Sequence, residues 1–208
     1  MNQISGTKGY SEVAELFIEA SNEIEFRELH QAFIEFIPIK PSRILDVGAG
    51  SGRDAAALAD KGHSVVAIEP TKAFRCAGKE RYNSSTIDWL DDSLPMLSQL
   101  ATTNQFDFIL ASAIWHHLNQ DEQQQAMKRI AKLLISGGIF ALTLRHGPAG
   151  VGTHVFQTNG QQTIENAKAC SLTPLLHIPN QPSLMSGKEA VTWTRLVFKK
   201  ASVNSQLD

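Results

Sequence analysis

Residues Ile44 to Asp54 read Ile-Leu-Asp-Val-Gly-Ala-Gly-Ser-Gly-Arg-Asp, and Glu69 ends the next apolar run. The first residues have the pattern of a strand, and the three alternating glycines allow a sharp turn and the close approach of a ligand. A helical pattern follows the turn, and a second strand pattern then leads to Glu69. Open parallel sheets bind ligands beyond the carboxyl ends of such strands. The stretch therefore predicts a cleft for a ligand that contains adenosine.

Outward from this stretch, strand and helix patterns alternate along most of the chain. Apolar runs predict strands at residues 43–47, 64–68, 86–90, 106–111 and 139–145. Helical spacing and capping residues predict helices at residues 11–22, 25–37, 53–61, 71–82, 93–101, 121–135 and 161–169. Two extended segments, 172–178 and 191–199, then follow each other without a helix between them. This order predicts a parallel, doubly wound α/β sheet that ends in an antiparallel pair.

The bulk composition is that of an ordinary globular domain. The length of 208 residues suits one domain, with 42% hydrophobic and 19% charged residues. The net charge of −2 and the lack of a run rich in Lys or Arg give no sign of a nucleic-acid partner. The chain shows neither an 18-residue apolar run nor a signal-type N-terminus, so we expect a cytoplasmic protein without a membrane partner. The two cysteines and seven histidines form no metal-ligand pattern, so we expect no metal, and the oligomeric state stays open.

The glycine spacing and the nearby acids indicate which adenosine ligand the cleft takes. Dinucleotide-binding chains carry Gly-x-Gly-x-x-Gly, whereas this chain has Gly-x-Gly-x-Gly followed by Arg53. A pyrophosphate would sit on the N-terminus of the following helix, where Asp54 would repel it. Asp46 adds further negative charge beneath the turn. These acids favour S-adenosyl-L-methionine, which carries a sulfonium and an ammonium but no phosphate, over NAD.

Acidic residues follow the second and third predicted strands, where they can contact the ribose and the adenine of the nucleoside. Glu69 stands where a carboxylate can accept both ribose hydroxyls in a charge-assisted pair of hydrogen bonds. Asp91 and Asp92 follow the third strand, where an acid or a backbone N–H can contact the adenine edge. These two acids also suit the cap of the helix predicted at 93–101, so both roles remain open for them.

Over about residues 40–200 the chain closely resembles the class I S-adenosylmethionine-dependent methyltransferases. The motifs that carry the resemblance are Asp46-Val47-Gly48-Ala49-Gly50-Ser51-Gly52, the acid Glu69, Asp91-Asp92-Ser93-Leu94-Pro95, Phe106-Asp107 through Trp115-His116-His117-Leu118, and Leu134-Ile135-Ser136-Gly137-Gly138, with Ser136 where Pro is usual. Two other segments, Gly52–Ala55 and Leu144–Pro148, are similar to a bacterial subgroup of small methyltransferases.

The resemblance implies a Rossmann-like, seven-stranded sheet of order 3-2-1-4-5-7-6, with strand seven antiparallel and helices on both faces. It also implies one methyltransferase domain over residues 1–208, in which residues 1–40 form a helical lid and residues 41–200 form the Rossmann-like core. The likeness is specific for the fold and the cofactor and weak for the methyl acceptor.

The resemblance further implies the residues of the site. Contacts to S-adenosyl-L-methionine and its product S-adenosyl-L-homocysteine are expected from Asp46, Gly48, Ala49, Gly50, Gly52, Arg53, Asp54, Glu69, Pro70, Asp91, Asp92, Ser93, Ala111, Ser112 and Trp115. Catalytic or acceptor-binding roles are expected for His117, Arg145 and His146, which follow strands four and five. We expect Trp193 and Arg195 at the same edge of the sheet, and Phe26 and His30 of the lid facing the cofactor.

The sequence thus predicts an enzyme that transfers a methyl group to a small-molecule acceptor. Such a transfer depends mostly on holding the acceptor in line with the methyl group, and a general base such as His117 is optional. The cationic residues Arg53, Arg145 and Arg195 lead us to hypothesise an anionic acceptor. Residues 111–115 read Ala-Ser-Ala-Ile-Trp, not Asp/Asn-Pro-Pro-Tyr/Phe, which disfavours amino methylation of bases or glutamine.

Two other functions stay open. A protein or RNA methyltransferase is disfavoured by the lack of a basic stretch. A non-catalytic module that binds S-adenosylmethionine, as a sensor or an assembly subunit, is not excluded by the sequence, because the cofactor motif and the catalytic residues are separable. An NAD-dependent oxidoreductase is disfavoured by the glycine spacing and by Asp54.

Overall fold

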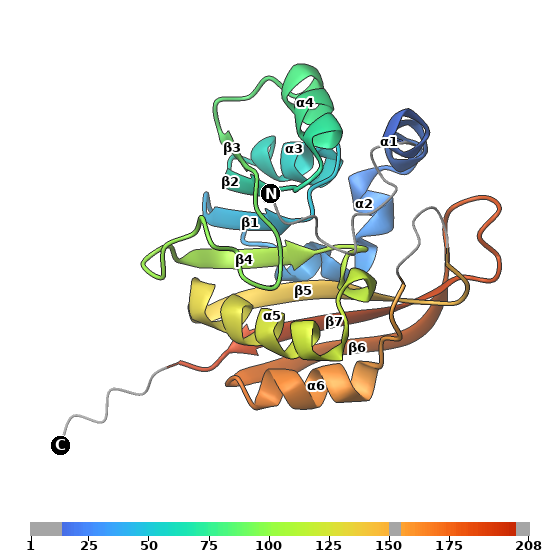
Figure 1. Ribbon diagram of the computed structural model, residues 1–208. Coiled ribbons are helices and arrows are strands. Elements are labelled where there is room, and N and C mark those ends of the chain that lie inside the picture. Colours follow the sequence, from blue (N-terminus) through green and yellow to red (C-terminus); the bar gives the residue numbers. More distant parts are fainter. Residues whose placement is uncertain (1–13, 150–154, 203–208) are drawn as a thin grey trace.

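The computed structural model describes residues 14–149 and 155–202 and has a seven-stranded sheet at its centre (Figure 1). The strand order is β3-β2-β1-β4-β5-β7-β6, and β7 runs antiparallel to both of its neighbours. The strands are β1 (Arg43–Val47), β2 (Ser64–Ile68), β3 (Ile87–Leu90), β4 (Phe106–Ala111), β5 (Leu134–His146), β6 (Leu172–Pro182) and β7 (Thr192–Lys200). This order and the direction of β7 confirm the predicted Rossmann-like fold.

Helices cover both faces of the sheet, as predicted. The helices are α1 (Ala14–Asn22), α2 (Phe26–Leu29), the 3-10 helix η3 (Gln31–Phe36), α3 (Arg53–Ala59), α4 (Lys72–Arg81), the 3-10 helix η4 (Trp115–His117), α5 (Gln120–Leu133) and α6 (Gly160–Lys168). The start of α5 shows why the chain turns helical there. The Asn119 side chain accepts a hydrogen bond from the Glu122 amide, and the Glu122 carboxylate accepts one from the Asn119 amide. This capping box satisfies two amides that the helix leaves unpaired.

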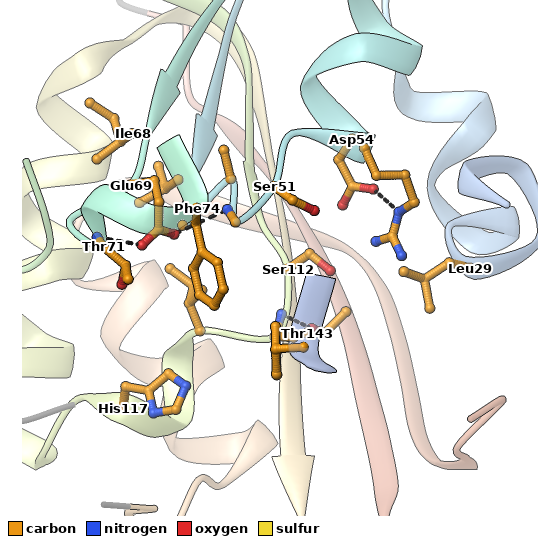
Figure 2. A pocket seen from close by; sticks show the side chains of 18 of the residues that line it. Leu29, Ser51, Asp54, Ile68, Glu69, Thr71, Phe74, Ser112, His117 and Thr143 are labelled. Carbon is orange, nitrogen blue, oxygen red and sulfur yellow. Dashed lines mark hydrogen bonds and ion pairs between the residues drawn. The ribbon is translucent and has the colours of Figure 1, made fainter. Parts of the chain in front are cut away.

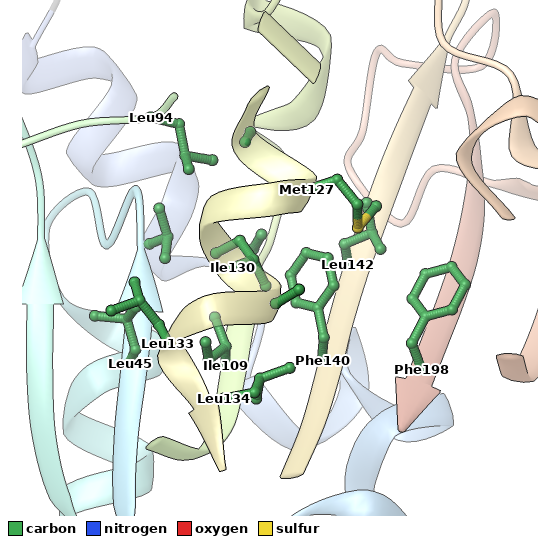
Figure 3. Close-up of a cluster of buried hydrophobic side chains, with 14 of the residues drawn as sticks. Leu45, Leu94, Ile109, Met127, Ile130, Leu133, Leu134, Phe140, Leu142 and Phe198 are labelled. Carbon is green, nitrogen blue, oxygen red and sulfur yellow. The ribbon is translucent and has the colours of Figure 1, made fainter. Parts of the chain in front are cut away.

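Two apolar clusters hold the layers together. Between α5 and the sheet, Met127 and Ile130 pack on Phe140 and Leu142 (Figure 3). On the opposite face, buried side chains of α2, η3 and α3 form a second cluster against β1 and β2. The sheet is therefore fixed from both sides, and the loops at its carboxyl edge are held in place by a rigid scaffold.

The predicted helix at 93–101 is wrong, because this segment folds as turns. The carboxylate of Asp92 accepts hydrogen bonds from the backbone N–H groups of Ser93, at 2.8 Å, and of Gln99, at 2.7 Å. Leu97 has a φ of 46°, which a helix does not allow, and its side chain is fully buried. Side-chain bonding to the backbone and burial of Leu97 together outweigh the local helical preference.

The single helix predicted at 25–37 is also wrong, because His30 divides it into α2 and η3. His30 has φ −106° and ψ 23°, outside the helical range, and its ring lies between those of Phe26 and Phe33. Its imidazole is fully buried and bonded to Asp54 of α3. The predicted start of α1 at Ser11 falls outside the described residues. Within the described ranges, no helix combines the length and the apolar character needed to cross a membrane.

Candidate cofactor and acceptor site

A cavity of about 240 Å³ opens at the carboxyl edge of the sheet, where β1 and β4 lie side by side and the winding reverses. Its walls come from the turns after β1, β2, β3 and β4, from the start of β7, and from α1 and α2. Figure 2 shows Glu69 and Thr71 on one side of this cavity and Asp54 and Leu29 on the other. Open α/β sheets bind their ligands at such a reversal point.

The three glycines after β1 serve different purposes. Gly48 has a φ of +72°, and a Cβ there would lie 2.3 Å from the side chain of Ile114. Gly52 has a φ of +91°, and a Cβ there would lie 2.8 Å from the indole of Trp89. Gly50, with a φ of +55°, lines the cavity and faces open space. The outer two glycines therefore allow tight packing, and the middle one leaves the backbone accessible to a ligand.

Glu69 stands at the end of β2 and is only 6% exposed. Its carboxylate accepts hydrogen bonds from the amide of Thr71 at 2.7 Å and from the amide of Gly50 at 3.0 Å (Figure 2). Burial raises the pKa of this carboxyl, while the two amides act in the opposite direction. Each carboxylate oxygen can accept a second hydrogen bond. Glu69 thus ties the glycine turn to the end of β2 and keeps acceptor capacity for a hydroxylated ligand.

Asp46 lies beneath the glycine turn, 2% exposed, and one of its carboxylate oxygens has no hydrogen-bond partner within the described part of the chain. Burial raises the pKa of Asp46 well above its usual range, the charges of Asp54 and Glu69 raise it further, and the charge of Arg53 acts in the opposite direction. Three carboxyl groups therefore interact unfavourably around the turn. A cationic ligand would relieve this repulsion, and a phosphate would increase it. The residues present fit the sulfonium and ammonium of S-adenosylmethionine.

We expect Asp46→Asn to stabilise the unliganded protein by on the order of 1 kcal/mol at pH 7. Because folding raises the pKa of this carboxyl, the wild type loses stability as pH rises from about 4 through the raised value. The amide variant has no ionisation at this position and lacks this loss. Urea unfolding at pH 5 and pH 8 measures the difference, with the exposed Asp88→Asn as control. The same pH dependence in wild type and Asp46→Asn would contradict the assignment.

Asp54 has two partners of its own. One carboxylate oxygen lies 2.8 Å from Nε2 of His30, and the other accepts a hydrogen bond from Nε of Arg53 at 2.7 Å. Burial acts to raise the pKa of Asp54, but His30 and Arg53 outweigh it and hold the pKa below its usual range. Asp54 is therefore ionised and already paired. Its charge is partly balanced by these two partners, so it repels a phosphate less than the sequence suggested.

The cavity includes ten of the residues predicted for the site, namely Gly48, Ala49, Gly50, Arg53, Asp54, Glu69, Pro70, Ser93, Ser112 and His117. The others predicted for the site lie outside its lining, namely Asp46, Gly52, Asp91, Asp92, Ala111, Trp115, Arg145 and His146. Of these, Asp46 is buried at the end of β1, and Gly52 packs closely against the indole of Trp89.

The acids after β3 point to other partners. The carboxylate of Asp91, half exposed, pairs with Arg75 at 2.5 Å. Asp92 binds the backbone of the following turn, as described above. Ser93 and Leu94 line the cavity in their place. Trp115 is buried against Phe140 in the core beneath η4.

Two histidines and an arginine lie close together at and beside the wall of the cavity that η4 forms. His117 lines the cavity, and its ring centroid lies 4.2 Å from that of buried His116. Burial, His117 and Arg145 lower the pKa of His116 well below its usual range, so His116 is neutral. Arg145 is 8% exposed and donates to the carbonyl of Gly147. His146 lies 2.8 Å from the hydroxyl of Thr194, and burial lowers its pKa.

Several lining residues were missed by sequence reasoning. Thr143 of β5 lines the cavity, and its hydroxyl accepts a hydrogen bond from the amide of Ala113 at 2.8 Å. The loop residues Ser183, Leu184 and Met185 reach the cavity from between β6 and β7. The position of Thr143 near the end of a central strand was a usable signal, whereas the loop carries no motif. In the α2 region, Leu29 lines the cavity, while Phe26 and His30, which were expected to face the cofactor, do not.

Comparison with known proteins points to one family. Residues 45–142 match the family model described as a methyltransferase domain. A curated, uncharacterized methyltransferase of Oceanobacillus iheyensis is 29% identical over 121 residues, which cover 58% of this chain and 55% of the relative. One from Staphylococcus carnosus is 29% identical over 125 residues, covering 58% of this chain and 57% of the relative. The match thus spans little more than half the length of these curated relatives.

Solved structures share the fold at lower identity. The 1,6-didemethyltoxoflavin-N1-methyltransferase of Burkholderia thailandensis, with bound 1,6-didemethyltoxoflavin and S-adenosylhomocysteine, has a TM-score of 0.71 at 19% identity. That similarity covers 93% of this chain and 86% of the other. The cyclase SpnF also has a TM-score of 0.71, at 15% identity, with 95% of this chain and 96% of the other covered.

Proposed function

Since this chain carries a class I S-adenosylmethionine-dependent methyltransferase domain, we propose that the protein transfers a methyl group from S-adenosylmethionine to a small-molecule acceptor. The observation that carries the proposal is the cavity at the sheet reversal, with buried Glu69 on one wall and the partly unpaired carboxyl of Asp46 beneath the turn. The cytoplasm is its proposed location.

The residues that would hold the cofactor follow from this geometry. Glu69 would accept the ribose hydroxyls, Gly50 would offer an open stretch of backbone, and Asp46 would stabilise positive charge near the turn. When bound, S-adenosylmethionine supplies a methyl group activated by a sulfonium and open to in-line displacement. The task left to the protein is to orient the acceptor and exclude water.

We assign acceptor binding to the region between η4, the start of β7 and the lid. Phe17 and Leu29 line the cavity from α1 and α2, which supports the role of residues 1–40 as a lid. His117 is the proposed general base for acceptors that must lose a proton, because it lines the cavity and stands next to neutral His116. Arg145 and His146 would position this wall from outside the lining.

A labelled-methyl assay tests the proposal. The protein is incubated with methyl-labelled S-adenosylmethionine and either a filtered small-molecule extract or the dialysed macromolecules of the same bacterial cells. We expect label in the small-molecule fraction and S-adenosylhomocysteine in equal amount. Label confined to protein or RNA would favour the alternative acceptor class. Absence of turnover with both fractions would contradict the enzymatic function.

A non-catalytic or non-methylating role is the second candidate. The structural neighbour SpnF is a cyclase, so the shared fold does not fix the reaction. This candidate predicts that S-adenosylmethionine binds without being consumed in either fraction of the labelled-methyl assay.

A further inference from the structure

Arg195 is a guanidinium in the cavity wall that no carboxylate of the described residues neutralises. It lies on β7, lines the cavity, and stands opposite Thr143 of β5 in the sheet register. Within residues 14–149 and 155–202, no Asp or Glu lies within ion-pair distance of it. Partial burial lowers the pKa of Arg195, and no neighbouring acid acts against this effect. The protein thus keeps a partly desolvated positive charge in its ligand cavity.

The other two arginines near the cavity have different surroundings. Arg53 lines the cavity, but its Nε donates to the carboxylate of Asp54 at 2.7 Å. Arg145 lies outside the lining and donates to a backbone carbonyl. Of the three arginines in this region, Arg195 is therefore the one that combines contact with the cavity and a charge not matched by an acid.

The wall around Arg195 is apolar and partly aromatic. Trp193 precedes it by two residues on β7, so both side chains lie on the same face of the sheet and both line the cavity. Leu29 and Met185 line the same cavity from the lid and from the loop before β7. Thr143 lies apart from Glu69 in Figure 2, which places the Arg195 wall away from the proposed ribose position.

We propose that Arg195 binds an anionic group of the methyl acceptor and selects an aromatic acid whose ring packs beside Trp193. This assignment rests on the proposed function, since the acceptor shares the cavity with the cofactor. A planar guanidinium matches a carboxylate with two parallel N–H···O bonds, which are stronger in a partly buried setting. A neutral acceptor would leave the desolvated cation without a partner. The indole adds a surface on which a flat ring can stack.

The test uses hydroxylated aromatic carboxylic acids, each paired with its primary amide as a neutral isostere. Binding to the protein saturated with S-adenosylhomocysteine is measured by ligand-observed NMR. We expect the acids to bind about tenfold or more tightly than their amides. Arg195→Gln should remove this preference, and the exposed Arg81→Gln should keep it. The melting temperature of each variant shows whether it is folded.

Two outcomes would overturn the assignment. One is an equal response of acids and amides in the wild type, including no response to either. The other is a preference for acids that survives in folded Arg195→Gln. Calorimetry with S-adenosylhomocysteine separates the two proposals. If S-adenosylhomocysteine binds but the acids have no advantage, only the role of Arg195 fails. If it does not bind, the proposed function itself fails.

Discussion

Replacement of Glu69 by alanine is expected to weaken the binding of S-adenosylhomocysteine roughly 100- to 10,000-fold, since each charge-assisted hydrogen bond contributes about 1.5–3 kcal/mol. Two such bonds to the ribose hydroxyls would be lost. The same carboxylate also holds the amides of Gly50 and Thr71, so the glycine turn loses a fixed acceptor in the variant. Isothermal titration calorimetry measures the affinity directly.

The control for this experiment is Asp88→Ala, which removes an exposed acid from β3. It should bind S-adenosylhomocysteine as the wild type does, because Asp88 does not line the cavity. Glu69→Gln is a useful intermediate, since it keeps one acceptor oxygen but not the charge. Wild-type affinity in Glu69→Ala would show that the ribose does not lie against Glu69.

Replacement of Asp54 by alanine is expected to destabilise the fold by about 3–5 kcal/mol, the usual cost of removing one partner from a buried ion pair. Asp54 bonds to His30 and to Arg53, and the His30 side chain is fully buried. Because interactions in the folded protein lower the pKa of Asp54, its contribution is present at neutral pH and is lost as the pH falls below its unfolded value of about 4. Urea unfolding at pH 7 measures the loss.

Asp60→Ala is the matched control, since Asp60 is exposed at the other end of α3 and should change stability by less than about 0.5 kcal/mol. A double variant, His30→Leu with Asp54→Leu, should lose less than the sum of the two single variants, because neither polar group is then left unpaired. If Asp54→Ala is as stable as Asp60→Ala, the pair does not anchor the segment of α2 and η3 to α3.

Several strands could be located because they are encoded locally, whereas their order in the sheet followed from the resemblance to a known family. Strands β1, β2 and β4 begin and end where the apolar runs do, since a strand buried on both faces reads as a continuous apolar stretch. The prediction of a helix at 93–101 was wrong because the conformation of this segment depends on the carboxylate of Asp92 and on the burial of Leu97. Neither effect leaves a periodic pattern in the sequence of the segment.

The same distinction applies to the candidate site: some of its residues could be located from the sequence, and some of its contacts could not. The glycine turn and Glu69 could be located from the sequence, because backbone conformation and strand ends fix them. The hydrogen bond between His30 and Asp54 joins residues 24 positions apart in the chain, and no sequence pattern predicts such a contact. The loop that brings Met185 to the cavity is likewise placed by the β6–β7 hairpin.

Calorimetric titration of the wild type with S-adenosylhomocysteine and with NAD tests the central claim, that this cavity is built for a cofactor with positive charge and no phosphate. We predict saturable binding of S-adenosylhomocysteine and no heat of binding with NAD. Tighter binding of NAD, or no binding of S-adenosylhomocysteine, would contradict the account.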